Sequence, residues 1–153
     1  NGANIATVTL HVGPGTFRNL RAEDLDKGEL HWEPYTIPPR TMEAIVACRS
    51  VGGRVTAVGT TVTRTLESAV TDDGCVRSGT GRTNLFIQPG FQFRVVDRLL
   101  TNLHLPRSSL LMLVSAFGGR DSVMTGYAEA VSRGYRFYSY GDAMFLELAG
   151  DSS

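Results

Sequence analysis

The chain has 153 residues, of which 42% are hydrophobic and 20% are charged, and its formal net charge is zero. This length and composition predict one globular domain with an apolar core. A zero net charge excludes a strong overall attraction to nucleic acid or to an anionic membrane, although it leaves room for a local basic patch. The longest apolar stretch, residues 110–117, is far shorter than the ~20 residues that span a bilayer.

The two cysteines, Cys48 and Cys75, lie far apart without metal-ligand spacing, and the sequence shows no secretory signal. Such cysteines are typical of a reducing compartment, so we predict a cytoplasmic protein without structural zinc. The first residue is asparagine rather than methionine, and the chain opens almost directly into a strand-like run. This opening indicates a fragment of a longer protein.

The first half of the chain predicts alternating strands and helices. β-Branched and apolar residues over 5–12 predict a buried strand, which a glycine loop follows. Residues 18–37 have no clean period and carry a short strand or a turn. Helical spacing of apolar residues predicts a helix over 39–51, and a short strand follows over 54–59. Threonines able to cap a helix begin the next predicted helix, 60–70.

The second half opens with turn-forming residues over 71–84, which predict a surface loop. A short apolar run over 85–87 predicts a buried strand, and residues 91–105 mix strand-like with helical spacing. The remaining predicted elements are a capped apolar helix over 108–117, an amphipathic helix over about 122–132 and a strand-like segment over 135–148.

The alternation of these elements predicts an α/β fold with a parallel or mixed layer or barrel. Ligands in such folds bind at the carboxyl ends of strands, where glycine loops and helix starts gather. Four clusters of polar residues lie at such places: residues 11–17, 58–68, 101–106 and 140–145.

Several common kinds of catalytic or binding site are excluded because their sequence motifs are missing. The G-P-G segment around Gly13 and Gly15 permits close approach of a ligand to the backbone, but it lacks the third glycine of a dinucleotide fingerprint. The sequence has neither a glycine-lysine phosphate loop nor a G-x-S-x-G nucleophile elbow. The three histidines lack close metal-ligand spacing, so we predict no metal site.

The most specific signal is the order of six segments: TLHVGPGTF, HWE, GGRVTAVGTTVTRTLESA, LFIQPGFQF, VVDRLLTNLHLPRSSLLMLVSAFGG and YRFYSYGDAMF. In this order and spacing the chain resembles the carboxyl-terminal half of the S-adenosylmethionine:tRNA ribosyltransferase-isomerases of queuosine biosynthesis. The resemblance implies transfer and isomerisation of the ribosyl part of S-adenosylmethionine onto 7-aminomethyl-7-deazaguanine at the tRNA wobble position. The implied products are epoxyqueuosine, adenine and methionine.

The same resemblance implies that residues 1–153 form part of an α/β barrel-like domain. The amino-terminal part of that domain and the family's inserted β-barrel are absent, so we expect the fragment alone to be inactive. S-adenosylmethionine is expected as donor substrate, without a further cofactor, and tRNA as partner. We expect a monomer and no membrane association.

The chain departs from the family pattern at Gly28, which stands where the family has the first histidine of H-x-M-H-x-E, whereas His31 and Glu33 are kept. Two alternatives therefore remain open. One is a divergent paralogue that uses a small acceptor instead of tRNA, and the other is a non-catalytic module that binds a nucleoside or RNA.

Four residues are predicted to be catalytic. In an extended segment, His31 and Glu33 point to the same side and act as a base or grip the donor; alternatively, Glu33 pairs with an arginine in a solvated loop. His104 is predicted to protonate the departing adenine, and Asp142 to bind the acceptor's aminomethyl cation or a ribose hydroxyl. Structural roles in a loop and in an ordinary turn are the alternatives.

A larger set is predicted to bind substrate. Thr60, Thr61 and Arg64 at a helix start suit a carboxylate such as the methionine tail, although a capping threonine with a surface arginine explains them equally well. Asn102 has the donor and acceptor that read a purine edge. The other predicted contacts are His11, Gly13, Gly15, Thr16, Phe17 and Tyr140.

Overall fold

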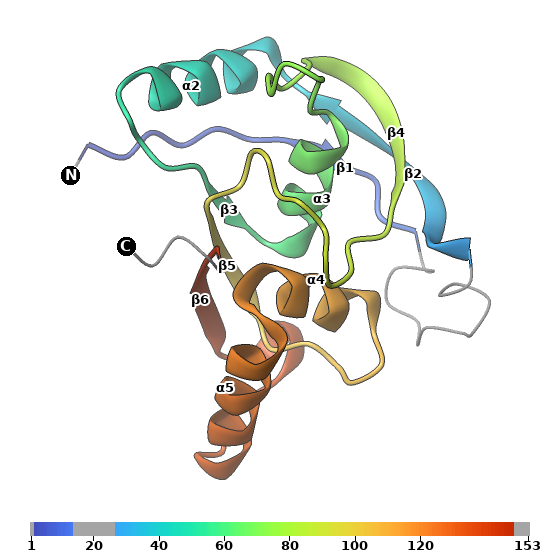
Figure 1. The fold of residues 1–153 in the computed structure, drawn as a ribbon, viewed down its shortest axis with the longest axis vertical. Coiled ribbons are helices and arrows are strands. Elements are labelled where there is room, and N and C mark those ends of the chain that lie inside the picture. Colours follow the sequence, from blue (N-terminus) through green and yellow to red (C-terminus); the bar gives the residue numbers. More distant parts are fainter. Residues whose placement is uncertain (1, 14–26, 149–153) are drawn as a thin grey trace.

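Two three-stranded sheets and four α-helices make up the part of the chain that a computed structural model describes, residues 2–13 and 27–148 (Figure 1). The α/β class is therefore confirmed. Within the described residues both sheets are open and no barrel forms, so the structure supports only this coarser part of the fold prediction. No described helix is long and apolar enough to cross a membrane.

The first sheet has the order β1-β2-β4 and is antiparallel throughout, with β1 at Thr9–Leu10, β2 at Glu29–Ile37 and β4 at Gly79–Leu85. The buried strand predicted over 5–12 is wrong, because the strand comprises only Thr9–Leu10 and Ile5 is 95% exposed. The loop predicted over 71–84 is also wrong beyond residue 78, where β4 begins.

Gly81 explains why the local sequence pattern does not predict β4. This glycine does not form a turn. A Cβ at this position would lie 2.5 Å from the Tyr35 ring of the paired strand. The residue therefore serves close packing across the sheet. The predicted strand over 85–87 is wrong in its bounds, since only Leu85 belongs to β4, although the next two residues are buried as expected.

The second sheet has the order β3-β5-β6, with β3 at Thr56–Val58, β5 at Arg98–Asn102 and β6 at Ala143–Glu147. The strand β3 runs parallel to β5, and β6 runs antiparallel to it. Successive side chains of a strand point to opposite faces of the sheet, and the two faces of this sheet differ. On one face Ala57 and Leu99 are fully buried, whereas the other face carries a cross-strand row of exposed apolar side chains, Val58, Leu100 and Phe145.

The four α-helices agree with the predicted ones to within about two residues. They are α2 (Pro39–Ser50), α3 (Thr60–Ser68), α4 (Ser109–Gly118) and α5 (Arg120–Ser132). The predicted cap of α4 is confirmed, because Ser108 Oγ accepts a hydrogen bond from Leu111 N at 3.1 Å. The threonine cap predicted for α3 is wrong: Gly59 is the N-cap, with a φ of 95°, and no side chain caps the helix.

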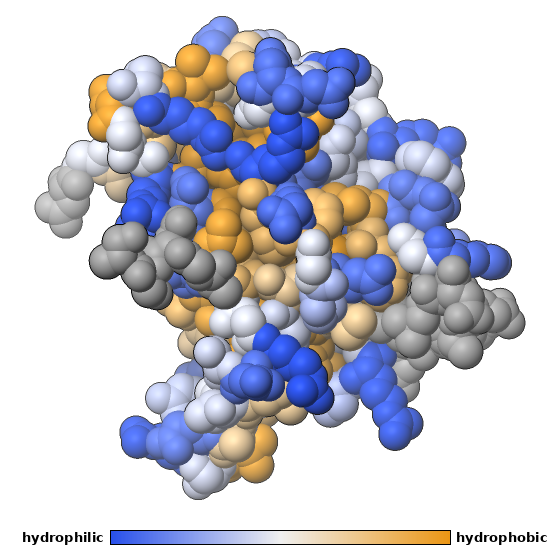
Figure 2. Space-filling model, viewed as in Figure 1, coloured by the Kyte–Doolittle hydropathy of each residue, from blue (hydrophilic) through white to orange (hydrophobic). Residues whose placement is uncertain are grey.

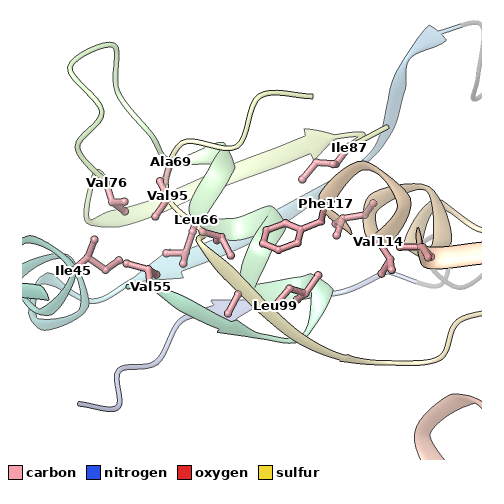
Figure 3. Packing of buried hydrophobic residues seen from close by; sticks show 14 of the residues in the cluster. Ile45, Val55, Leu66, Ala69, Val76, Ile87, Val95, Leu99, Val114 and Phe117 are labelled. Carbon is pink, nitrogen blue, oxygen red and sulfur yellow. The ribbon is translucent and has the colours of Figure 1, made fainter. Parts of the chain in front are cut away.

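The helix α3 contacts strands of both sheets and carries Leu66 into the apolar core. Figure 3 shows Leu66, Leu99 and Phe117 together in this core, with contributions from α3, β5 and α4. All the other buried residues of α3 are polar, namely Thr60, Thr63, Arg64, Thr65 and Glu67. Polar groups therefore lie in the interior beside the core.

The surface carries apolar side chains across the middle of the face shown in Figure 2, between regions rich in polar residues. Exposed large apolar residues of the described chain include Trp32, Val58, Met124 and Phe145.

Candidate functional site

A buried ion pair joins the first sheet to α3. Glu33 of β2 is 2% exposed and Arg64 of α3 is 3% exposed, and Arg64 Nη1 donates to Glu33 Oε2 at 2.6 Å. The other carboxylate oxygen accepts a hydrogen bond from Gly13 N at 2.8 Å. Three predicted site residues that are far apart in sequence thus meet at one carboxylate. Glu33 does pair with an arginine, but the pair is buried and Glu33 lies in a strand rather than in a solvated loop.

One nitrogen of the Arg64 guanidinium is unpaired in the part of the chain that the structure describes. Nε donates to Leu85 O at 3.1 Å and Nη1 to Glu33, but Nη2 is buried and has no hydrogen-bond partner among the described residues. Buried donors are nearly always paired, because an unpaired one loses its hydration without compensation. Arg64 therefore keeps capacity for one more acceptor.

Glu67, one turn further along α3, has a different role. Its Oε2 accepts from Arg94 N at 2.9 Å, and its Oε1 accepts from Val95 N at 3.0 Å and Val96 N at 2.9 Å. A pairing of Glu67 with Arg64, which their three-residue spacing permits, does not occur. Glu67 instead fixes the backbone that leads into β5.

A second polar group surrounds His104, just after β5. Thr101 Oγ1 and His104 Nε2 lie 2.9 Å apart, and His104 N donates to the Tyr127 hydroxyl of α5 at 2.8 Å. Burial lowers the pKa of His104 from 6.5 to about 4, because the imidazolium would lose hydration in this position. The imidazole is therefore neutral at pH 7.

The turn before β6 contacts the carboxyl end of β5, close to His104. Asp142 Oδ2 accepts from Arg136 N at 2.8 Å, and Asp142 N donates to Arg136 O at 2.9 Å. The amide of Asn102 donates to Asp142 O at 3.4 Å. Gly141 is required here, because a Cβ would lie 1.9 Å from Arg136 O. We call His104, Thr101, Asn102, Tyr127 and this turn the histidine corner.

The start of α3 lies next to the histidine corner. Since β3 and β5 are parallel, their carboxyl ends meet at one edge, and Gly59 N donates to Leu100 O at 2.8 Å. Thr60 and Thr61 follow directly, and Thr60 is buried. The structure therefore brings together two of the predicted clusters, the helix start and the segment after β5.

Other predicted residues are placed differently. His11 and His31 are exposed, and His11 N donates to Pro34 O at 2.9 Å, which extends the pairing of β1 with β2. Tyr140 belongs to the short 3₁₀ helix Tyr138–Tyr140. Gly15, Thr16 and Phe17 lie outside the described residues. Among the residues that are described, no three histidine, cysteine or acidic side chains form a group suited to a metal ion.

Sequence reasoning missed Thr101 and Tyr127 as site residues. Thr101 stands in the correct segment but reads as an ordinary strand residue. Tyr127 is one of several apolar positions on an amphipathic helix and gives no signal by itself. Two cavities lie away from the ion pair and the histidine corner. One of 450 Å³ lies between α5 and β6, and one of 590 Å³ lies beside α2. Neither is lined by Arg64 or His104.

In α/β folds, polar side chains gathered at the carboxyl ends of adjacent strands are typical of a ligand-binding site. The family comparison is more specific, since residues 1–146 match the model described as queuosine biosynthesis protein. The chain belongs to this family.

Individual relatives agree with this assignment. The chain is 57% identical over 147 residues to the S-adenosylmethionine:tRNA ribosyltransferase-isomerase of Nitrosomonas europaea, and 57% identical over 145 residues to that of Geobacter sulfurreducens. Each match covers 95% of this chain but 42% of the relative, so the chain spans less than half the length of these proteins.

The fold is similar to the crystal structure of the S-adenosylmethionine tRNA ribosyltransferase from Thermotoga maritima. The TM-score is 0.69 and the sequence identity is 51%, over 74% of this chain and 40% of that one.

Proposed function

We propose that the chain is part of an S-adenosylmethionine:tRNA ribosyltransferase-isomerase. The observation that carries the proposal is 57% identity to proteins of that name over 95% of the chain. The reaction transfers and isomerises the ribosyl part of S-adenosylmethionine onto 7-aminomethyl-7-deazaguanine in tRNA. It yields epoxyqueuosine, adenine and methionine.

The donor determines what the site has to supply. The sulfonium cation acidifies the neighbouring 5′ protons, so that a positioned base removes one of them and the resulting ylide eliminates adenine. The acceptor amine then bonds to the opened ribose, and epoxide closure releases methionine. This chemistry requires a base, a hydrogen-bond donor for adenine and little free water, and it proceeds with S-adenosylmethionine as substrate and no further cofactor.

The start of α3 is proposed to bind the methionine carboxylate. Its first N–H groups have no side-chain cap, and anions favour this end of a helix dipole. Thr60 and Thr61 add hydroxyls at the same end. Arg64 supports the assignment, because its buried Nη2 has no partner among the residues that the structure describes, and a guanidinium pairs well with a carboxylate.

Glu33 is proposed to shape the donor site through the backbone that it holds. Its two carboxylate oxygens accept hydrogen bonds from Arg64 and from the N–H of Gly13, the first glycine of the G-P-G segment. The proposed donor contacts of that loop are His11, Gly13, Gly15, Thr16 and Phe17. A role of Glu33 or His31 as the base stays a prediction, as does the binding of the acceptor by Asp142 and Tyr140.

Adenine is proposed to leave at the histidine corner. Asn102 reads the purine edge, and His104 faces the departing base. Because the low pKa of His104 keeps the imidazole neutral, it assists by donating a hydrogen bond rather than by acting as an imidazolium acid.

The remaining expectations concern the whole protein. We propose that residues 1–153 form the carboxyl-terminal part of an α/β barrel-like domain whose two open sheets are completed by further chain. The proposed setting is a cytoplasmic monomer that binds tRNA with the 7-deazaguanine at the wobble position.

The test incubates the full-length protein that contains this chain with S-adenosylmethionine and tRNA bearing the aminomethyl base. Adenine is followed by chromatography and the modified nucleoside by mass spectrometry. The expected result is stoichiometric adenine and epoxyqueuosine. Adenine release with a free 7-deazapurine amine, but not with tRNA, would show a small acceptor instead, and release with neither would refute an enzymatic role.

A further inference from the structure

His104 is anchored at two points that come from different elements. Thr101 of β5 lies 2.9 Å from the imidazole Nε2, and the Tyr127 hydroxyl of α5 accepts the backbone N–H of His104 at 2.8 Å. Thr101 is 5% exposed and Tyr127 is 7% exposed, so water competes little for either bond. The Tyr127 ring also packs edge-on against Phe137, with 5.8 Å between ring centroids. Both anchors are therefore fixed in the interior.

The count of hydrogens assigns the tautomer of the imidazole. Thr101 Oγ1 has one hydrogen, and among the described residues its side chain bonds to His104 Nε2 alone. If Nε2 carried the ring proton, the hydroxyl hydrogen of Thr101 would be buried without an acceptor, which costs about 1–3 kcal/mol. The favoured arrangement has Thr101 donating to Nε2, and the neutral ring then carries its proton on Nδ1.

Nδ1 of His104 has no hydrogen-bond partner within residues 2–13 and 27–148. The side-chain bond described for His104 engages Nε2, and the ring is only partly buried. An Nδ1–H group therefore remains to donate to an acceptor outside the protein. The start of α3, the proposed binding site of the methionine tail, lies at the same edge of the second sheet.

We propose that Thr101 and Tyr127 are positioning residues that hold His104 with Nδ1–H directed at a ring nitrogen of the departing adenine. The hydrogen bond stabilises the negative charge that develops on the purine as the glycosidic C–N bond breaks and its electron pair moves to the base. His104 keeps its proton, and the purine anion becomes adenine by taking up the proton that the base removed from the 5′ carbon. This inference rests on the proposed function, but the tautomer is a property of the protein alone.

The tautomer is measured by two-bond ¹H–¹⁵N NMR of the full-length protein labelled at histidine, with the His104 signals assigned by loss in His104→Gln. The expected spectrum at pH 7 shows a neutral His104 with the proton on Nδ1. Thr101→Val removes the hydroxyl donor and is expected to shift the tautomer toward Nε2–H, while Thr101→Ser retains the wild-type pattern. A wild-type His104 with its proton on Nε2 would overturn the proposal, even if a variant failed to fold.

Kinetics test the catalytic consequence separately. Thr101→Val is expected to slow adenine release roughly 10-fold at saturating S-adenosylmethionine, with KM within twofold, and Thr101→Ser is expected to restore most of the rate. Tyr127→Phe removes the acceptor of His104 N and should slow release less. The matched controls are Thr125→Val and Tyr135→Phe, which alter exposed side chains of α5 and its following turn. An unchanged rate in folded Thr101→Val would overturn the positioning role, whereas no adenine from wild type would refute the proposed function and leave the tautomer measurement decisive.

Discussion

The buried ion pair and the histidine corner use polar groups in opposite ways. Glu33 and Arg64 keep their charges inside the protein by pairing with each other, and Gly13 and Leu85 complete the set. His104 instead stays neutral, because burial lowers its pKa to about 4. The ion pair is stable in the interior because the two charges compensate each other, whereas the histidine corner contains a neutral imidazole. The comparison teaches that Arg64 suits an anionic part of a ligand, whereas His104 suits a neutral heterocycle.

The largest expected effect comes from breaking the pair. Arg64→Met removes the Arg64 countercharge from the buried Glu33 carboxylate and is expected to lower the free energy of unfolding by about 3–5 kcal/mol. The matched control is Arg98→Met, which breaks the exposed pair with Glu147 at 2.9 Å and should cost less than about 1 kcal/mol. Urea denaturation of both variants measures the difference. Equal losses would contradict the view that Arg64 compensates a buried charge.

The pH dependence of stability probes the neutral histidine. The folded pKa of His104 is about 4 and the unfolded value is 6.5, so the unfolded state binds more protons between these values. The stability contributed by the neutral ring is present above pH 6.5 and lost as the pH falls toward 4, by up to ~2–3 kcal/mol.

The measurement compares urea denaturation of wild type and His104→Gln at several pH values between 4 and 7. Wild type is expected to lose more stability toward pH 4 than the variant, which has no imidazole at this position. The same slope in both proteins would show that His104 titrates normally in the folded state.

The turn of the histidine corner has a smaller expected effect. Gly141→Ala places a methyl group against Arg136 O, where the Cβ would lie 1.9 Å away, and is expected to cost about 1–3 kcal/mol and to weaken the bond of Asn102 to Asp142 O. Gly126→Ala in α5 is the control, because a Cβ there meets no atom within 4 Å, and it should be neutral or stabilising. Thermal denaturation separates the two variants, and a Gly141→Ala protein as stable as the control would show that the turn adapts.

The sequence predicted the helices well because each has a local signal. Apolar spacing and a stop at glycine mark α2, and Ser108 marks the start of α4. The strands β2 and β4 were harder, because Gly81 is dictated by Tyr35 across the sheet and not by its neighbours in sequence. The predicted strand over 5–12 failed for the converse reason: its alternation is genuine, but most of it finds no partner strand among the described residues.

The candidate site shows the same difference between features with a local sequence signal and features set by long-range contacts. Sequence motifs selected Glu33, Arg64 and His104, but they could not show which arginine pairs with Glu33, because Arg64 is 31 residues away in another element. Tyr127 was missed since its only distinguishing feature is the hydroxyl that meets His104 N across the fold. Long-range pairings of this kind leave no trace in local pattern.

The most direct measurement of the central claim is the single-turnover rate of adenine release by the full-length protein, with His104 replaced by two amides of different reach. Gln places its amide near the Nε2 position and loses the donor at Nδ1, whereas Asn keeps a donor near Nδ1. The account predicts a loss of at least about 100-fold in His104→Gln and a clearly smaller loss in His104→Asn, with binding of S-adenosylmethionine within twofold of wild type. A His104→Gln protein that releases adenine at the wild-type rate would contradict it.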